Sequence, residues 1–356
     1  MKSRMGAASY DGGMTETTLV LVGNAKAGTV SVLKLGEGSL EPLSTSTIGA
    51  GTGTFAVDAA HSLVYCATKQ PEPAIVTLRL DRSSGVLTEV ARRAVAEPLA
   101  YLTLTRDGDL LLGASYQGGW GVAWPVADGG LVGEETSRVE HANLHCVVTD
   151  SASRYAYFVS LGDDLISQTA IGEDGVLTPL DPPTVAAPEG SGPRHLVLAA
   201  DEHAAYLVTE FSGEAIRLER DPATGQLTRA ESVSIVDPEA GLTHSRFGAD
   251  PMAEHLIWGA DVHVARFGSY LLATERTAST VAVVSLDADG LLGGVVGLVP
   301  TEAQPRGFAV APDSRHVVVA GEGSGSVAVY ELSDEGELVK RDRHETGAGA
   351  NWVRFA

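Results

Sequence analysis

Seven copies of one sequence pattern recur along the chain, and this repeat limits the possible folds more than any other feature. In each copy an alternating segment leads into a turn containing Gly, and a leucine follows the turn. Such turns, which combine Asp or Ser with Gly, are typical of β-hairpins. Five of the six intervals between the closing leucines measure 44 to 50 residues, and the sixth measures 65. The copies are VSVLKLGEGSL (30–40), VTLRLDRSSGVL (76–87), VAWPVADGGL (122–131), ISQTAIGEDGVL (166–177), IRLERDPATGQL (216–227), VAVVSLDADGLL (281–292) and VAVYELSDEGEL (327–338).

A second pattern precedes the hairpins, in which a polar turn joins two apolar strands, as in FAVDAAHSLVYCAT (55–68) and FAVAPDSRHVVVAGE (308–322). The two patterns together give four short strands per copy. Seven such copies predict an all-β fold, a seven-bladed β-propeller with four antiparallel strands per blade. NWVRFA (351–356) matches the first strand of a copy and TLVLVGN (18–24) matches the second. We therefore expect the two ends of the chain to share one blade and close the ring.

The repeat also defines the domain organisation. Residues 18–356 are expected to form one propeller, preceded by a polar, flexible tail at 1–17. The longest interval predicts an insertion at roughly 235–260, placed on a loop.

Equivalent positions of a repeat lie on a ring, so aligning the copies shows which side chains share one face. Two series are predicted to open on the same mouth of the central channel. The residue just before each first strand is Gly53, Ala100, His145, Arg194, Ala260, Arg306 or Asn351. The residue at the end of each second strand is Asn24, Lys69, Tyr116, Ser160, Glu210, Glu275 or Glu322.

This mouth gathers an unusual number of ionisable residues, namely Lys69, His145, Arg194, His195, Glu210, Glu275, Arg276 and Arg306. One interpretation is a set of structural salt bridges, such as one between Arg194 and Glu210. The other is a binding site for a small anion, since paired arginines favour carboxylate or phosphate. The net charge of −21 argues against nucleic acid and anionic membranes as partners.

Other motifs add little. Asp250, His255, Asp261 and His263 lie in or beside the insertion, and ADVH (260–263) resembles half of a metal site. HExxH, CxxC and compact Asp loops are absent from the sequence. GxSxG and GxxxxGK motifs are absent as well, so we expect neither a metal nor a cofactor. The N-terminal residues lack the apolar run of a signal peptide, which favours a cytoplasmic protein. A closed ring with few exposed edges favours a monomer.

Several motifs resemble the seven-bladed lactonase family of bacterial 6-phosphogluconolactonases, and the resemblance extends from about residue 18 to the C-terminus. They are GSGPRH (190–195), the TE pair at 209–210, WGADVH (258–263), ERTAS (275–279) and TEAQPRGF (301–308). The same family includes fungal carboxymuconate-lactonising enzymes, whose active site is attributed to a His, two Arg and a Glu. The matching residues here are His145, Arg194, Glu210 and Arg306. NLHCVVTD (143–150) and YQGGWGVAW (116–124) depart from the bacterial pattern.

The resemblance implies a cytoplasmic hydrolase of carbohydrate metabolism that opens a sugar-acid lactone. The expected substrate is 6-phospho-D-glucono-1,5-lactone of the pentose phosphate pathway. Glu210 or His145 would act as the general base, and Arg194 and Arg306 would stabilise the oxyanion or hold the phosphate. The residues expected to bind the substrate are Lys69, His195, His263, Glu275 and Arg276. A muconate-type lactonising isomerase and a non-catalytic ligand-binding propeller are the two alternatives.

Overall fold

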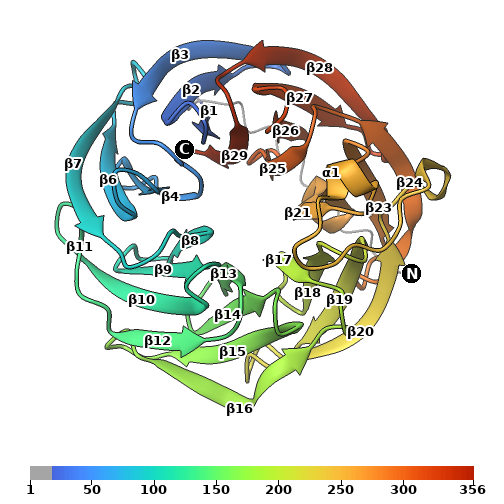
Figure 1. Ribbon diagram of the computed structural model, residues 1–356, viewed down its shortest axis with the longest axis horizontal. Helices are drawn as coiled ribbons and strands as arrows, with labels where there is room; N and C mark the ends of the chain where they lie inside the picture. Colours follow the sequence, from blue (N-terminus) through green and yellow to red (C-terminus); the bar gives the residue numbers. More distant parts are fainter. Residues whose placement is uncertain (1–17) are drawn as a thin grey trace, which may run out of the picture.

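The computed structural model describes residues 18–356, in which the strands form seven antiparallel sheets arranged as blades around a central axis (Figure 1). This arrangement confirms the predicted seven-bladed β-propeller. The expectation of a flexible tail at 1–17 lies outside the described residues. Blade 1 combines both ends of the chain, and blades 2 to 7 follow in sequence order.

The strands form concentric layers. The innermost strands are β29 (Ala350–Phe355), β4 (Phe55–Asp58), β8 (Tyr101–Leu104), β13 (Leu144–Thr149), β17 (Pro193–Leu198), β21 (Gly259–Ala265) and β25 (Pro305–Val310). The second strands are β1 (Thr18–Asn24), β5 (Leu63–Thr68), β9 (Leu110–Ser115), β14 (Tyr155–Ser160), β18 (Ala204–Thr209), β22 (Tyr270–Glu275) and β26 (His316–Gly321).

The third strands are β2 (Thr29–Leu35), β6 (Ala74–Leu80), β10 (Trp120–Ala127), β15 (Leu165–Ile171), β19 (Glu214–Arg220), β23 (Thr280–Leu286) and β27 (Ser326–Leu332). The outer strands are β3 (Leu40–Thr47), β7 (Leu87–Ala94), β11 (Leu131–Val132), β12 (Ser137–Glu140), β16 (Leu177–Ala186), β20 (Leu227–Ser234), β24 (Leu292–Pro300) and β28 (Leu338–Glu345).

The ring closes through pairing of the two chain ends. β1 pairs antiparallel with β29, and Val22 lies opposite Val353. This pairing confirms the predicted shared blade, in which strands from the two ends of the chain complete one four-stranded sheet.

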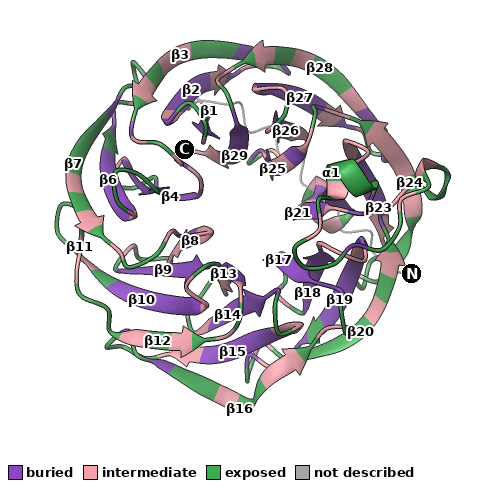
Figure 2. Ribbon diagram, in the orientation of Figure 1, coloured by how far each residue is buried: buried purple, intermediate pink, exposed green. Residues whose placement is uncertain are grey.

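Burial follows the layers, as Figure 2 shows. All six residues of β5 are buried, because the neighbouring blades cover both faces of a second strand. In outer strands such as β7 most residues are exposed, because water covers the outside of the ring. The core therefore lies between the faces of adjacent blades; Leu21 of blade 1, for example, packs in one cluster with Val64 of blade 2.

Blade 3 departs from the predicted hairpin. The repeat predicts that Leu131 opens a full outer strand, but β11 has only two residues and Leu131 is 54% exposed. Gly129 and Gly130 both have positive φ and lie in the short loop between Ala127 and Leu131, which pair with each other. β12 takes the outer position instead, pairing with β10.

The predicted insertion spans the connection between β20 and β21. It contains a 3₁₀ turn, Pro238–Ala240, and one short helix, α1 (Pro251–Glu254), capped by Asp250. A second 3₁₀ turn, Arg266–Gly268, follows β21. The insertion is held on the rim where innermost strands begin, because the amide of Ser245 donates to the carbonyl of Phe211.

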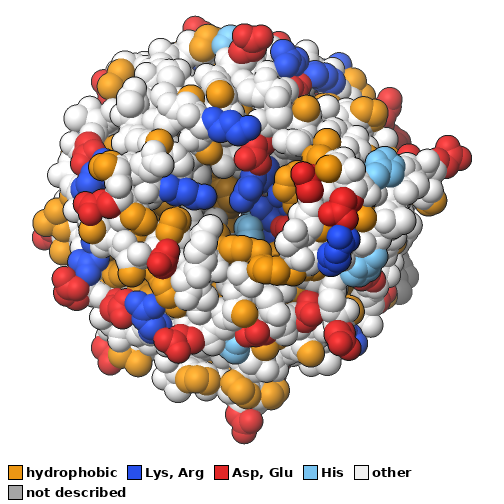
Figure 3. All heavy atoms as spheres, viewed as in Figure 1, with side chains coloured by type: hydrophobic (Ala, Val, Ile, Leu, Met, Phe, Trp, Pro, Cys, Tyr) orange, Lys and Arg blue, Asp and Glu red, His pale blue; other side chains and the backbone are white. Residues whose placement is uncertain are grey.

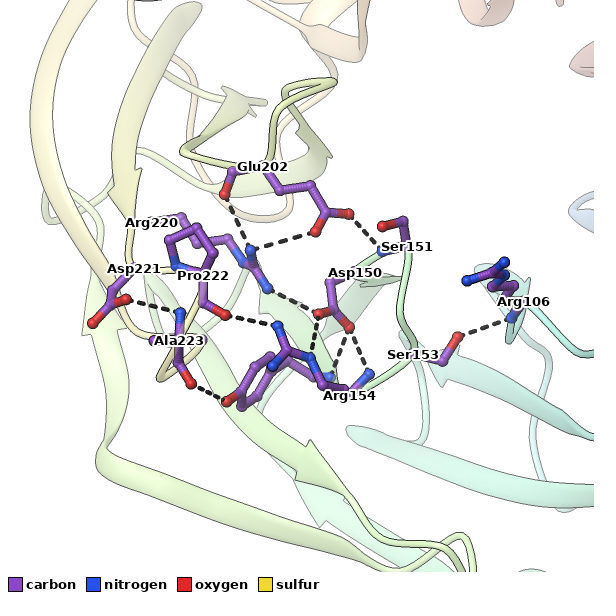
Figure 4. Close-up of polar contacts among 12 residues, drawn as sticks. Arg106, Asp150, Ser151, Ser153, Arg154, Glu202, Arg220, Asp221, Pro222 and Ala223 are labelled. Carbon is purple, nitrogen blue, oxygen red and sulfur yellow. Dashed lines mark hydrogen bonds and ion pairs between the residues drawn. The ribbon is translucent and has the colours of Figure 1, made fainter.

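A buried ion-pair cluster joins blades 4 and 5 (Figure 4). Arg220, at the end of β19, donates through Nη2 to Asp150 over 3.0 Å, and both side chains are fully buried. Nη1 of Arg220 donates to the carbonyl of Glu202. Arg154 of blade 4 donates to the carbonyl of Pro222 in blade 5. These contacts fix the two blades relative to each other.

Candidate active site

Five innermost strands contain a β-bulge close to their first residue. In four of them the residue without a partner on the second strand is His145, Arg194, Arg306 or Asn351. A bulge breaks the regular alternation of side chains and redirects one of them. These four residues are all in the series that the repeat alignment places just before the first strand, and all four line one cavity on the propeller axis.

The cavity measures about 350 Å³. Figure 3 shows Lys or Arg side chains and a histidine gathered in the hollow at the centre of this face. The structure thus brings together six of the sequence-predicted site residues: Lys69, His145, Arg194, Glu210, Arg276 and Arg306.

Glu210 lies between two buried arginines. Its Oε2 accepts from Nε of Arg194 over 2.8 Å and lies 3.0 Å from Nη2 of Arg276. The structure therefore contains the salt bridge between Arg194 and Glu210 that one interpretation of the sequence predicted. Both arginines contact the same oxygen, so Oε1 has no protein partner within residues 18–356 and remains available in the cavity.

The charges around Glu210 control its protonation. Burial by itself would raise the pKa of this carboxyl, but Arg276, Arg194 and Arg306 outweigh burial and lower it. Burial lowers the pKa of Arg276 to about 9, although Glu210 acts in the opposite direction. At neutral pH the site therefore holds an ionised Glu210 and a charged Arg276.

Arg276 is also fixed by the insertion. Its Nε donates to the carbonyl of Trp258 and its Nη2 to the carbonyl of Gly259. The guanidinium lies 3.8 Å from the centre of the Trp258 ring, a cation–π contact. Trp258 has no counterpart in the repeat, and sequence analysis missed it as a cavity residue.

Arg306 and Lys69 are the more accessible cations of the site. The Arg306 side chain is 34% exposed, and its Nη1 lies 3.6 Å from Oε2 of Glu322. Burial lowers the pKa of Lys69, as does the charge of Arg306, while Glu322 opposes them. Two cations with one loosely held carboxylate can accept an anionic group from solution.

His145 is 5% exposed, and its Nδ1 is buried without a hydrogen-bond partner in the described chain. Burial lowers its pKa well below the ordinary value, and the charges of Arg194 and Arg306 add to this effect. The imidazole is therefore neutral at physiological pH. Its ring lies edge-on to that of Tyr116, with centroids 5.8 Å apart.

His195, His263 and Glu275 do not line the cavity. Glu275 accepts from the backbone amides of Trp258, Thr277 and Ala278, so its carboxylate shapes the turn after β22. His263 lies further along β21, with its ring against Phe308 and its Nε2 3.4 Å from Asp261. Because of these positions we do not propose the substrate-binding role expected for Glu275 and His263.

His195 lies beneath the cavity floor. It is 2% exposed, and its Nδ1 lies 2.7 Å from Oδ1 of Asp261. Its Nε2 lies 3.2 Å from Nη1 of Arg194. His195 thus contacts a cavity residue rather than the cavity.

Other residues of the lining could have been found from the repeat. Tyr116, Glu322 and Asn351 stand in the two aligned series, and all three line the cavity. In the described part of the chain no group of three or more His, Cys, Asp or Glu side chains is arranged to hold a metal ion. Asp250, in the insertion, accepts from the amide of Ala253 as a helix cap.

None of the helices in residues 18–356 is long and apolar enough to cross a membrane.

Comparison with known proteins identifies relatives over most of the chain. It is 28% identical to a 6-phosphogluconolactonase of Klebsiella pneumoniae over 286 residues, which cover 80% of this chain and 82% of the relative. It is 27% identical to the 6-phosphogluconolactonase of an Enterobacter species over 319 residues, which cover 89% and 92%. The periplasmic gluconolactonase of Pseudomonas aeruginosa has the same fold, with a TM-score of 0.84, 22% identity and coverage of 96% and 99%.

The family model for lactonases with a seven-bladed β-propeller matches residues 12–355, nearly the whole chain. With the observed ring of blades, this match shows that the chain belongs to the seven-bladed β-propeller lactonase family.

Proposed function

We propose that this chain is a lactonase that hydrolyses 6-phospho-D-glucono-1,5-lactone to 6-phosphogluconate. The single observation that carries the proposal is the axial cavity, where Lys69, Arg194, Arg276 and Arg306 surround a neutral His145 and an ionised Glu210. The names of the curated relatives support this substrate. A lactone is an ester with a reactive carbonyl, so water can open it without a covalent nucleophile in the enzyme.

In the proposed mechanism a water molecule attacks the lactone carbonyl carbon while a general base takes one of its protons. We assign the base to His145, which lines the cavity and is neutral because burial lowers its pKa. Glu210 is held ionised by Arg194 and Arg276, so its low pKa makes it the weaker base. Its unpaired Oε1 would accept a hydrogen bond from the water or from a sugar hydroxyl.

The attack puts negative charge on the former carbonyl oxygen. Nη2 of Arg194 has no hydrogen bond to the described chain, so it can donate to this oxyanion. Collapse of the tetrahedral intermediate breaks the bond to the ring oxygen, which takes up the proton from His145. The products are a free hydroxyl and a carboxylic acid, which releases the remaining proton of the water to solvent and becomes a carboxylate. Arg306 and Lys69, nearer the mouth, would hold the phosphate.

The test is the rate of opening of 6-phosphogluconolactone beside unphosphorylated gluconolactone, each corrected for the reaction in buffer. We expect acceleration of both, with a higher kcat/KM for the phosphorylated lactone. Arg92→Ala, on the outer strand β7, is the matched control for arginine variants in the cavity. No acceleration of either lactone at any pH would refute the proposal, and turnover of a muconate instead would favour the isomerase.

The cytoplasmic location and the monomeric state stay predictions. Cell fractionation and size-exclusion chromatography test them.

A further inference from the structure

Asp261 is a buried carboxylate in the bulge of β21, where Ala260 and Asp261 both face Thr274. It is 5% exposed and collects donors from three innermost strands. Oδ1 lies 2.7 Å from Nδ1 of His195 in β17 and accepts from the amide of Val262, while Oδ2 accepts from the amide of Phe308 in β25. A carboxylate removed from water at this depth is stable only with such a set of partners.

The contacts of His195 define its tautomer. A guanidinium has only donors, so at 3.2 Å from Nη1 of Arg194 the Nε2 of His195 must be the acceptor. The hydrogen of a neutral imidazole is then on Nδ1, which donates it to Asp261. The chain of hydrogen bonds runs in one direction, from Arg194 through His195 to Asp261.

Arg194 is held on two of its nitrogens by these partners. Nη1 donates to His195 and, over 2.5 Å, to the carbonyl of Ala260, while Nε donates to Glu210. Only Nη2 has no hydrogen bond to the described chain, and Arg194 lines the cavity. The direction in which Nη2 points is thus fixed by His195 and the carbonyl of Ala260 at Nη1 and by Glu210 at Nε.

We infer that Asp261 and His195 are positioning residues, which orient the Nη2 of Arg194 toward the reacting carbonyl through the fixed tautomer of His195. The inference deepens the proposed function and rests on it for the identity of the oxyanion. The groups facing His195 are Arg194, Asp261, Arg354 and the rings of Tyr101, His145 and Trp352. Burial and Arg194 lower the pKa of His195 to about 3, so the acceptor at Nε2 persists at neutral pH.

The first test does not depend on the substrate. Long-range ¹H–¹⁵N correlation spectra of histidine-labelled protein at pH 7 report the tautomer of each histidine. We expect His195, assigned by its loss in His195→Gln, to be neutral with hydrogen on Nδ1. An imidazolium or an Nε2–H tautomer would overturn the inference, even if the lactonase proposal holds.

The second test compares two amides at position 195. The Gln side chain in His195→Gln reaches the place of Nε2 and can accept from Arg194, but it loses Asp261. The Asn side chain in His195→Asn keeps a donor for Asp261 but no acceptor for Arg194. We expect Gln to retain at least about 10-fold more kcat than Asn, the size of effect seen for groups that orient a functional ligand. If only the hydrogen bond to Asp261 matters, His195→Asn should instead retain more kcat than His195→Gln.

A double-mutant cycle then asks whether Asp261 acts through Arg194. Asp261→Asn should lower kcat by about 10- to 100-fold in the wild-type chain but have little further effect with Arg194→Ala. The same substitution should be additive with Arg306→Ala, which the chain of hydrogen bonds does not include. Additivity with Arg194→Ala would contradict the inference. Circular dichroism and thermal unfolding check folding, and if Asp261→Asn does not fold, the comparison of Gln and Asn decides.

If the wild-type chain opens no lactone, the proposed function fails, whereas the tautomer measurement still tests the hydrogen-bond chain.

Discussion

The side chains of Arg194 and Glu210 meet over 2.8 Å across neighbouring strands of blade 5, one from the bulge of β17 and the other just after β18. Because Arg276 of blade 6 contacts the same carboxylate oxygen, one carboxylate neutralises two buried guanidinium groups. The site therefore depends on Glu210 for charge balance as well as for chemistry.

Glu210→Gln should impair both stability and activity. The amide leaves Arg194 and Arg276 without a counter-charge, and breaking a buried ion pair typically costs about 3–5 kcal/mol of unfolding free energy. We expect a lower Tm, and a fall in kcat/KM of at least about 100-fold because each lost charged hydrogen bond costs about 1.5–3 kcal/mol. Denaturant unfolding and lactone kinetics measure the two effects. An unchanged Tm would show that Glu210 does not compensate the arginines.

Arg306→Ala should weaken recognition of the phosphate more than the chemical step. Loss of one charged hydrogen-bonding group costs about 1.5–3 kcal/mol, or roughly 10- to 100-fold in KM for the phosphorylated lactone. The change in KM for unphosphorylated gluconolactone should be smaller, and Lys69→Ala should show the same preference. Equal losses for both lactones would argue that Arg306 does not face the phosphate.

Trp258→Ala should lower kcat/KM because Arg276 loses its aromatic contact. The indole stacks on this guanidinium, and a buried cation–π contact contributes about 2 kcal/mol. We expect kcat/KM to fall about 10-fold or more, whereas Trp258→Phe, which keeps an aromatic face, should lose less. Steady-state kinetics of both variants measure these two losses. If the insertion only covered the rim, Trp258→Ala would lose no more kcat/KM than Trp258→Phe.

The pH dependence of kcat/KM should report His145. The base works only in its neutral form, so activity is lost as pH falls through the folded-state pKa. Burial and the neighbouring arginines lower that pKa, so the midpoint of the acid limb should lie below the ordinary histidine value of about 6.5. His145→Gln should remove the limb and lower kcat by about 10²- to 10⁴-fold. A midpoint at or above about 6.5 would exclude His145 as the base.

Arg220→Ala should destabilise the fold without affecting the chemistry. The substitution leaves Asp150 fully buried and without its ion pair, at a cost of about 3–5 kcal/mol. Arg92→Ala, which breaks a pair on the outer strand, should cost at most about 1 kcal/mol. Urea unfolding compares the two variants, and kcat of Arg220→Ala should stay near the wild-type value at temperatures where the variant is folded.

The repeat was sufficient to predict the ring and its closure. Strand alternation and Gly-containing turns are local properties, and seven copies of them leave few ways to pair the strands. The two aligned series also predicted which residues lie at the mouth of the central channel, since equivalent residues of a propeller lie at equal distances from the axis. Leu131 shows the limit of this reasoning, because it fits the repeat but opens a strand, β11, of only two residues.

The amino-acid sequence by itself thus determined the seven blades, the shared first blade and the residues that begin and end the strands at the mouth. The tertiary structure decided which of those side chains face the cavity. Adjacent residues such as Arg194 and His195 differ in direction because of a bulge. Glu275 turns away because the backbone amides of Trp258 and Ala278 satisfy its carboxylate. Trp258 and Asp261 gained their contacts only when distant strands came together, since hydrogen bonds and ring contacts between blades depend on distances that no local pattern encodes.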